Sequence, residues 1–443
     1  RLDLHPYFLL VLCVLILEPT LRRPPLDFLS LQQLGKTHHN NTDSSRSQLG
    51  RFMDGALSGI KVVEAASYVT GPFASQLLAD MAAEVVKIEE PKRGDPFRGW
   101  GERNYAATFC SLNRNKKSVT LDLRTDEGRD IALRLMGNAD VVIQNFRPGV
   151  MDKRGLGYND VRKINPKIVY CSISGFGPKG PYRDMPGYDT VGQARSGLLS
   201  LLTDPGKPQG MGISFSDHLT GMYACYGVLG ALVNRMVTGE GQHVETSLLR
   251  ASVSFVSENA ARYFETGHVP RRKHRTTTAG VFAFEDQDGL AFVLHMSSPD
   301  KFWLGLFDVV GKPEWAQDAR FNNRKGRIEN YDMLVEQLQP IFRSGSRDEW
   351  LRRLFEKDVP AAPINTLDEV FADPQVREYG FPVEVEHPKM GKMKLVGNAV
   401  DMSRTPPTIH RPPPVLGEHT EETLNALGYD AANISSLRTK GVI

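Results

Sequence analysis

The chain has 443 residues, of which 40% are hydrophobic and 24% charged, a composition typical of a soluble globular protein with two or three domains. Its 54 basic and 52 acidic residues give a net charge of +2. This balance excludes the basic field of a nucleic-acid-binding protein, so any anionic ligand must be held by local patches. The four cysteines are far apart and form no CxxC pair, which argues against a zinc cluster or a disulfide framework.

Residues 1–54 differ in composition from the rest of the chain, and we expect them to form a leader outside the fold. The apolar run from Phe8 to Leu17 has ten residues, which is too short to cross a bilayer, so no stable membrane insertion is expected. Residues 19–54 are rich in Pro, Ser, Asn, Gln and Arg and show no periodicity. A segment rich in Arg and poor in acids is typical of organelle import, so we predict a disordered or mitochondrial transit segment and a location in the matrix.

Residues 55–250 alternate between strand-like and helix-like patterns. Apolar runs predict strands at 60–64, 85–89, 118–123, 140–145 and 168–174. The alternation predicts an α/β fold, in which a Rossmann-like large domain has a mainly parallel sheet and binds ligands at the carboxyl ends of its strands. The first turn reads ASYVTGP and lacks GxGxxG, so the usual grip on a dinucleotide pyrophosphate is not expected.

Three loops next to these strands combine cations with aromatic side chains. They carry Lys92, Arg93, Arg98, Arg114, Lys116, Lys117, Arg147, Lys153 and Arg154, with Phe97, Trp100 and Phe146 among them. If the loops meet at one edge of the sheet, they suit a phosphorylated, purine-bearing ligand, because cations bind phosphates and flat rings stack on the base. Charged loops are also typical of plain solvated surface, but three in one domain favour a ligand site.

A Gly/Pro-rich segment leads to Asp217, the candidate nucleophile. Apolar residues at helical spacing predict a helix from there to about Val237, ended by Gly239. The apolar positions are Leu219, Met222, Tyr223, Tyr226, Leu229, Val233 and Met236. Asp217 would lie at or just before the helix N-terminus, where Asp is also a preferred cap. The two roles are compatible, since a helix N-terminus lowers the pKa of a carboxyl group and keeps it ionised.

The sequence resembles the class III CoA-transferases, a family that includes formyl-CoA and carnitine CoA-transferases and the alpha-methylacyl-CoA racemases. The resemblance covers about residues 55–443 and depends on several blocks in the family's order. They include LNRNKKSVTLDL, ADVVIQNFRPGVMDKRGLGY, GYDTVGQARSG, FADPQVREYG and PPPVLGEHTEETLNALGYD. Within the family the chain is most similar to mitochondrial members that use succinyl-CoA and glutarate.

The resemblance implies which residues form the site. The family's nucleophilic aspartate follows the GYD or GHD motif by about thirty residues, and Asp217 follows Tyr188 by 29. Ser67 takes the place of a glutamine that orients the thioester in some members, and HRTTTAGVF lacks the glycine run of formyl-CoA transferases, so this activity is not expected. We expect the substrate and CoA to contact Ser67, Arg98, Arg114, Lys116, Asn145, Phe146, Arg147, Lys153, Arg154, Tyr188 and Arg195.

The mechanism implied by the resemblance is ping-pong transfer, in which Asp217 attacks an acyl-CoA, forms a mixed anhydride and then becomes an aspartyl-CoA thioester. Coenzyme A thioester is therefore a substrate, and neither a permanently bound cofactor nor a metal is expected. Backbone N–H groups near Gly187 and Gly212 would stabilise the oxyanions. We expect succinyl-CoA as donor and a short dicarboxylate such as glutarate as acceptor. The far carboxylate of the acceptor would bind Arg195 or the basic cluster at 271–275. If it does not bind there, this cluster is interpreted as a solvated linker.

Two other functions stay open at this point. A racemase or epimerase of acyl-CoA esters would use the family's GHD histidine as an acid or base. Tyr188 stands at that position here and is a poor base, because an unperturbed tyrosine has a pKa of about 10. A non-catalytic acyl-CoA-binding protein would need Asp217 only as a helix cap.

The rest of the chain is expected to leave the large domain and return to it. We assign 251–279 to a linker, 280–366 to a smaller α+β domain and 367–443 to a return segment that completes the large domain. In the family such arms join two subunits into an interlocked dimer, so the resemblance implies a homodimer.

Overall fold

The computed structural model describes residues 55–101, 105–204, 206–297 and 299–443. The predicted leader, 1–54, lies outside the described residues. None of the helices in these ranges is both long and apolar enough to cross a membrane.

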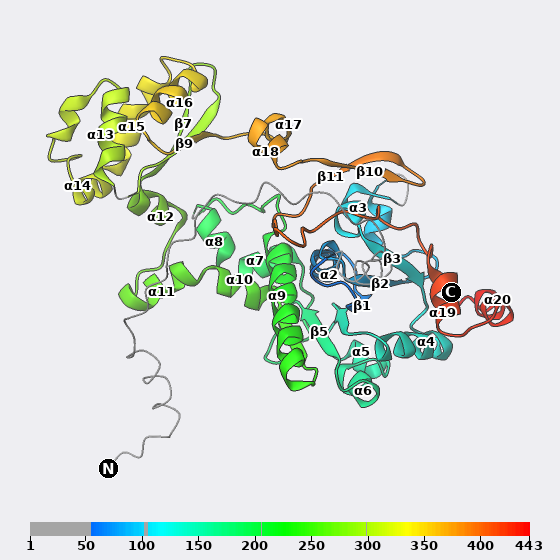
Figure 1. Cartoon of the computed structure of the whole chain (residues 1–443). Helices are drawn as coiled ribbons and strands as arrows, with labels where there is room; N and C mark the ends of the chain where they lie inside the picture. The colour runs from blue at the N-terminus through cyan, green and yellow to red at the C-terminus, as the bar shows by residue number, and fades with distance from the viewer. Residues whose placement is uncertain (1–54, 102–104, 205, 298) are drawn as a thin grey trace, which may run out of the picture. The chain divides into compact units, whose positions relative to one another are not determined.

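The large domain is built on a six-stranded parallel sheet with the strand order β3-β2-β1-β4-β5-β6 (Figure 1). Its strands are β1 (Lys61–Ala65), β2 (Glu84–Glu89), β3 (Lys116–Thr120), β4 (Val141–Gln144), β5 (Val169–Ser174) and β6 (His243–Ser247). The prediction of a parallel, Rossmann-like sheet is confirmed. The sequence analysis missed β6, because its HVETS pattern holds one strong apolar residue and is half polar.

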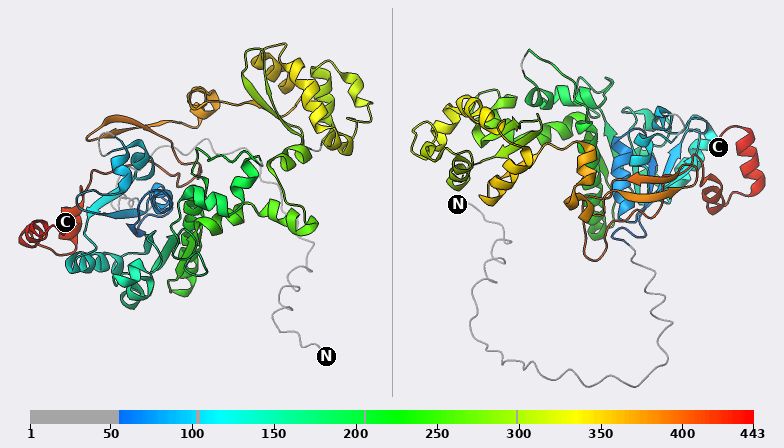
Figure 2. Two further views of the ribbon diagram at one scale, coloured as in Figure 1. Left: turned by 180° about the vertical axis from the view of Figure 1, so that it is seen from behind. Right: turned by 90° about the horizontal axis from the view of Figure 1, so that it is seen from above.

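Alternate residues of the strands face two separate hydrophobic cores. Val62 of β1 is in register with Val85 and Val141 of its neighbours, and all three face helices α2 (Thr70–Asp80) and α9 (Phe215–Thr238). Val63, the next residue, contacts the opposite core. That core is covered by α4 (Asp126–Gly137), α6 (Tyr158–Ile164), α19 (Thr420–Ala426) and α20 (Ala431–Thr439). Figure 2 shows the sheet between α9 and the C-terminal helices.

Helices α2 and α9 pack closely because one residue at their crossing has no side chain. A Cβ atom on Gly221 would lie 2.9 Å from the carbonyl oxygen of Thr70 and 2.9 Å from Cδ1 of Phe73. Helix α9 can therefore begin directly beside the N-terminus of α2, which brings Asp217 next to the loop that follows β1.

Short helices connect the strands and lead out of the large domain. Those between the strands are η2 (Pro96–Trp100), α3 (Ala107–Leu112), α5 (Val150–Lys153), α7 (Asp189–Arg195) and α8 (Leu198–Leu202). The expected linker is helical, with α10 (Leu248–Phe255), α11 (Ser257–Thr266) and α12 (Arg272–Ala279).

A smaller unit follows, with an aromatic core of its own around Phe282, Phe292 and Trp303. Its antiparallel sheet contains β7 (Val281–Glu285), β8 (Ala291–His295) and β9 (Ala361–Pro363). Its helices are α13 (Asp300–Val309), η3 (Pro313–Ala316), α14 (Arg324–Glu329), α15 (Tyr331–Phe342) and α16 (Arg347–Glu356). The chain continues through α17 (Leu367–Ala372), α18 (Pro374–Glu378) and a hairpin of β10 (Val383–His387) and β11 (Gly391–Leu395) before it reaches α19.

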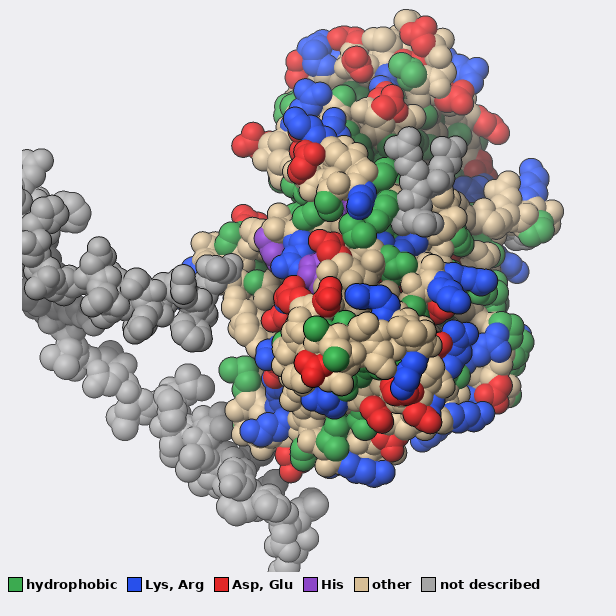
Figure 3. Space-filling view, turned by 90° about the vertical axis from the view of Figure 1, so that its right-hand side faces the viewer, with side chains coloured by type: hydrophobic (Ala, Val, Ile, Leu, Met, Phe, Trp, Pro, Cys, Tyr) green, Lys and Arg blue, Asp and Glu red, His purple; other side chains and the backbone are tan. Residues whose placement is uncertain are grey.

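The surface charges are mixed. The face seen from the right-hand side of Figure 1 carries basic and acidic side chains next to one another rather than a field of one sign (Figure 3). This agrees with the near-neutral net charge of +2.

Candidate active site

A cavity of about 310 Å³ lies at the carboxyl ends of β1, β4 and β5. Its wall is formed by the loops that follow these strands, by the Gly/Pro-rich segment and by the start of α9. Five expected contact residues and the expected nucleophile line it, namely Ser67, Asn145, Phe146, Arg147, Tyr188 and Asp217. The fold therefore places the cavity where a parallel sheet ordinarily binds its ligand.

Asp217 lies in the first turn of α9 and faces this cavity. The residue at the helix cap is Ser214, three positions earlier, so Asp217 lies at the helix N-terminus as expected, but inside the first turn rather than at the cap. The backbone N–H of Asp217 donates a hydrogen bond of 3.2 Å to Oδ1 of Asp189. The Asp217 side chain is thus free of a capping role and is available to a ligand.

The surroundings of Asp217 oppose its ionisation. Burial, and secondly the negative charge of Asp189, raise the pKa of Asp217 to about 7. We expected the helix N-terminus to lower this pKa, and that expectation is wrong because burial and the charge of Asp189 both disfavour the ionised form. Asp217 therefore loses its proton at a higher pH than an exposed aspartate does.

Asn145 joins two of the loops that form the cavity. Its side-chain amide donates to the carbonyl oxygen of Ser67 at 2.7 Å and to Oγ1 of Thr70 at 3.0 Å, while its Oδ1 accepts from the Ser67 N–H at 3.0 Å. Between these anchors Tyr68 has a left-handed backbone, with φ of 64°, and its ring meets that of Tyr188 edge-on at 6.0 Å. The loop after β1 is therefore tied to the loop after β4, and it carries a residue with a strained backbone at the cavity wall.

A second cavity, of about 300 Å³, lies beside the first at the ends of β2 and β3 and shares Ser67 and Phe146 with it. Arg154 lines this second cavity, with its guanidinium 5.1 Å from the centre of the Phe146 ring. A flat ring beside a cation matches the chemistry that the sequence predicted for this edge. Lys153 is exposed on α5, and neither cavity includes it in its wall.

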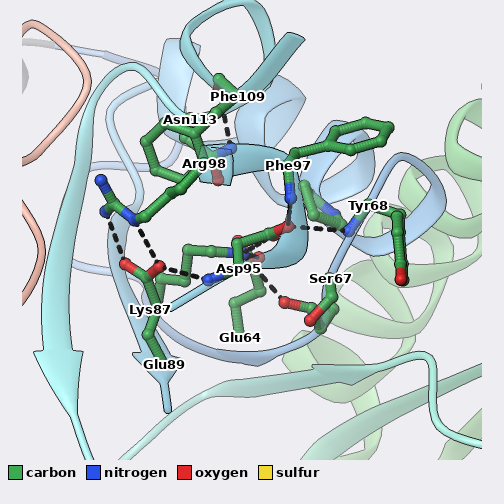
Figure 4. A network of polar contacts seen from close by, with 12 residues as sticks. Glu64, Ser67, Tyr68, Lys87, Glu89, Asp95, Phe97, Arg98, Phe109 and Asn113 are labelled. Atoms are coloured by element: carbon green, nitrogen blue, oxygen red, sulfur yellow. Dashed lines mark hydrogen bonds and ion pairs between the residues drawn. The ribbon is translucent and has the colours of Figure 1, made fainter. Parts of the chain in front are cut away.

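Three of the expected CoA-contact residues are in the interior instead. Arg98, Arg114 and Lys116 are almost fully buried, and they pair with Glu89 at 2.7 Å, with Asp80 at 2.7 Å and with Glu64 at 2.8 Å, respectively. Figure 4 shows Arg98 and Glu89 within this network. The assignment of these three cations to ligand binding is corrected, because their charges are already neutralised by carboxylates inside the fold.

The same buried network holds the loop that follows β1. Lys87 pairs with Glu64 at 2.6 Å and with Asp95 at 2.9 Å, and it donates to the carbonyl oxygen of Ala66 at 2.9 Å. Asp95 accepts the backbone N–H of Tyr68 at 3.3 Å (Figure 4). These buried charges support the geometry of the loop at the cavity wall, and Glu89 and Asp95 also line the second cavity.

Residues 57–420 match the family model described as CoA-transferase family III. The chain belongs to the family III CoA-transferases. It is therefore an enzyme of the CoA-transferase class, and the two substrates of such an enzyme are a CoA thioester and a carboxylic acid.

The relatives of this family III CoA-transferase include proteins named for succinate and glutarate. It is 36% identical to the succinate–glutarate CoA-transferase of Agrobacterium fabrum, over 84% of this chain and 95% of the relative. It is 34% identical to the human succinyl-CoA:glutarate CoA-transferase, over 87% of this chain and 90% of the human protein. The solved structure of a CAIB/BAIF family protein from Brucella suis is 35% identical in sequence to this chain and superposes on it with a TM-score of 0.75. The superposition covers 84% of this chain and 99% of the Brucella chain.

Sequence reasoning missed Tyr68 and Arg183, which line the cavity, and Asp189, which contacts the backbone of Asp217 without lining the cavity. Asp189 follows Tyr188 in the GYD motif, so its position next to a predicted site residue was the available signal. Tyr68 and Arg183 lie in loops where no periodic pattern marks a residue as facing inward. Arg195, which we expected at the substrate, is exposed and lies over the ring of Tyr182 at 4.0 Å, outside the cavity wall.

Proposed function

We propose that this transferase moves CoA from succinyl-CoA to a short dicarboxylic acid such as glutarate, with Asp217 as the nucleophile. The observation that supports this most strongly is the position of Asp217, a partly buried carboxyl group without a capping role at the wall of the cavity. The names of the Agrobacterium and human relatives favour these two acids.

In the first half of the reaction a carboxylate oxygen of Asp217 attacks the thioester carbonyl carbon, and the carbon–sulfur bond breaks. This gives a mixed anhydride and CoA thiolate. The thiolate then attacks the aspartyl carbonyl carbon, which releases succinate and leaves an aspartyl-CoA thioester. The second acid repeats these steps in reverse order and leaves as the new CoA thioester. A raised pKa suits this role, since the carboxylate that attacks is poorly hydrated and more basic than an exposed one.

We place CoA across the two cavities that share Ser67 and Phe146. The nucleotide end takes the second cavity, where Arg154 supplies positive charge and Phe146 a flat ring. The thioester then reaches Asp217 in the first cavity, past Arg147. The exposed Tyr188 and its partner Tyr68 flank this path.

We also propose that the enzyme is a homodimer. Helix α9 exposes a stripe of large apolar side chains, formed by Tyr226, Val233, Met236 and Val237, that one chain leaves in contact with water. A contiguous apolar face of this kind is typical of a surface covered by another protein chain.

For residues 1–54, which include Arg22, Arg23, Arg46 and Arg51, we propose a mitochondrial import segment and therefore a matrix location. Fusion of these residues to a fluorescent protein tests the proposal. The fusion protein is expected in mitochondria, and cytosolic fluorescence would contradict it.

Substitution of the nucleophile tests the proposed reaction. We expect Asp217→Asn to lower the rate of CoA transfer from succinyl-CoA to glutarate by about 10³-fold or more, since the amide cannot form the anhydride. Full activity in this variant would show that the nucleophile is another group. Incorporation of deuterium at the alpha carbon of a branched acyl-CoA, without transfer, would instead support a racemase.

A further inference from the structure

Two cations line the cavity that contains Asp217. Arg147 is in the loop after β4, next to Phe146, on the side where the proposed function places CoA. Arg183 is in the Gly/Pro-rich segment, and it also lines a smaller cavity of about 140 Å³. The wall around Asp217 therefore includes a second cation, Arg183, besides the one on the proposed CoA side.

The guanidinium of Arg183 is available to bind an anionic ligand. In the described part of the chain its ion partner is the adjacent Asp184, at 2.8 Å, and both side chains are partly or largely exposed. An exposed pair of this kind contributes little, so Arg183 can exchange it for a substrate carboxylate at small cost. Its Nη2 atom reaches across to the β4 loop, where it would lie 3.4 Å from a Cβ atom built on Gly149.

The other cations that we considered for the far carboxylate are engaged elsewhere. Arg195 stacks on the ring of Tyr182 at 4.0 Å. In the basic cluster at 271–275, Arg272 pairs with Asp204 at 2.7 Å and Lys273 with Asp332 at 2.5 Å. None of these cations is in the wall of the cavity that holds Asp217.

Acidic groups lie beyond Arg183. Asp152 and Glu245 line the smaller cavity together with Arg183. A carboxylate that moved past Arg183 would meet these negative charges, so the most favourable place for it is at Arg183 itself. The distribution of charge thus favours a substrate with a carboxylate at each end, whose distal carboxylate binds at Arg183.

We infer that Arg183 binds the distal carboxylate of a dicarboxylic substrate while the other end reacts at Asp217. This inference rests on the proposed function and names the residue that selects its substrate class. The guanidinium can hold a carboxylate through two parallel hydrogen bonds. A monocarboxylic acid of equal length leaves Arg183 without this partner and is discriminated against.

The test compares glutarate with pentanoate, a monocarboxylate of equal length, as acceptors for the full-length enzyme. In a ping-pong reaction kcat/KM for the acceptor reports the second half-reaction alone, so the donor succinyl-CoA does not obscure the result. We expect Arg183→Gln to lower kcat/KM for glutarate by tenfold to about a hundredfold. The kcat/KM of the variant for pentanoate should stay within about threefold of the wild-type value. Arg183→Lys should keep part of the preference, since it retains the charge but loses the planar fork.

Three further variants make the outcome decisive. Arg147→Gln, on the CoA side, should lower kcat/KM for both acids alike. Arg195→Gln and Arg352→Gln should change neither, the latter being a surface residue of α16 that pairs with Glu349. The inference is overturned if the wild type does not prefer glutarate, if Arg183→Gln keeps the preference, or if Arg195→Gln removes it. If the wild type forms no CoA adduct and transfers to neither acid, the proposed function itself fails.

Discussion

At the scale of single residues, the chemistry depends on an acid that is difficult to ionise. The nucleophile that we propose, Asp217, can attack a thioester only as the carboxylate, and burial and Asp189 raise its pKa to about 7. The ionised fraction therefore increases steeply as the pH rises toward 7 and is nearly complete one unit above it. If Asp217 is the nucleophile, as we propose, its local environment sets the pH range of the reaction.

We therefore expect kcat/KM for the acyl-CoA to rise about tenfold per pH unit below about 7 and to level off above it. The measurement is a pH–rate profile from pH 5 to 9. Asp189→Asn removes the neighbouring charge but keeps an oxygen that accepts the N–H of Asp217, so its rising limb should move to lower pH. A flat wild-type profile, or an identical profile in Asp189→Asn, would contradict this explanation.

The predicted site residues that the structure places at the cavity are those fixed by a motif or by spacing. Asn145 and Phe146 follow a recognisable strand, and Asp217 lies at a set distance from Tyr188. Arg98 and Arg114 were misassigned, because the sequence displays a charge but not its partner. The acids that neutralise them, Asp80 among them, come from other elements of the fold, and a pattern along one segment cannot reveal such a pair.

At the scale of elements, the sheet was predictable because apolar runs mark strands that are buried on both faces. Strand β6 was missed because, at the edge of the sheet, it needs fewer apolar residues. Helix α9 was predicted with its end at Gly239, but its buried face was not. The structure buries small residues such as Ala224 and Val228 against α2, whereas most of the large apolar residues of the predicted stripe are exposed.

The buried ion network should contribute strongly to stability. Burial alone would raise the pKa of Glu64, but Lys116 and Lys87 outweigh it and lower the pKa to about 2. A carboxylate whose pKa is lower in the folded than in the unfolded state stabilises the fold above about pH 4.5 and loses this contribution as the pH falls toward 2. The network should therefore be intact at neutral pH.

We expect Lys87→Met to lower the free energy of unfolding by about 3–5 kcal/mol at pH 7, because it leaves buried carboxylates without a partner. Urea unfolding followed by tryptophan fluorescence measures the change. The control is Lys357→Met, which removes an exposed pair with Asp308 and should have no measurable effect. Equal stability of the two variants would show that the network does not support the fold.

At the scale of the whole molecule, the exposed apolar stripe of α9 is a feature of the described residues that a single chain leaves unexplained. Met236 is 86% exposed and Tyr226 75%. Large apolar side chains that remain this exposed disfavour a monomer, since a second copy of the chain can remove them from water.

We predict that the wild type is a dimer at micromolar concentration and that Met236→Glu shifts it toward the monomer. Analytical ultracentrifugation measures both. Phe355→Glu is the matched control, because Phe355 is 83% exposed on α16, outside the α9 stripe, and its substitution should leave the dimer intact. A monomeric wild type, or dissociation in Phe355→Glu but not in Met236→Glu, would contradict the proposal.

The most direct test of the account is to trap the covalent intermediate. The purified enzyme is incubated with succinyl-CoA in the absence of an acceptor, quenched in acid, digested and analysed by mass spectrometry. We predict that the peptide containing Asp217 carries CoA as a thioester, and that Asp217→Asn, prepared in the same way, carries none. CoA found on a different residue, or turnover by an enzyme that never carries CoA, would contradict the assignment of Asp217 as the nucleophile.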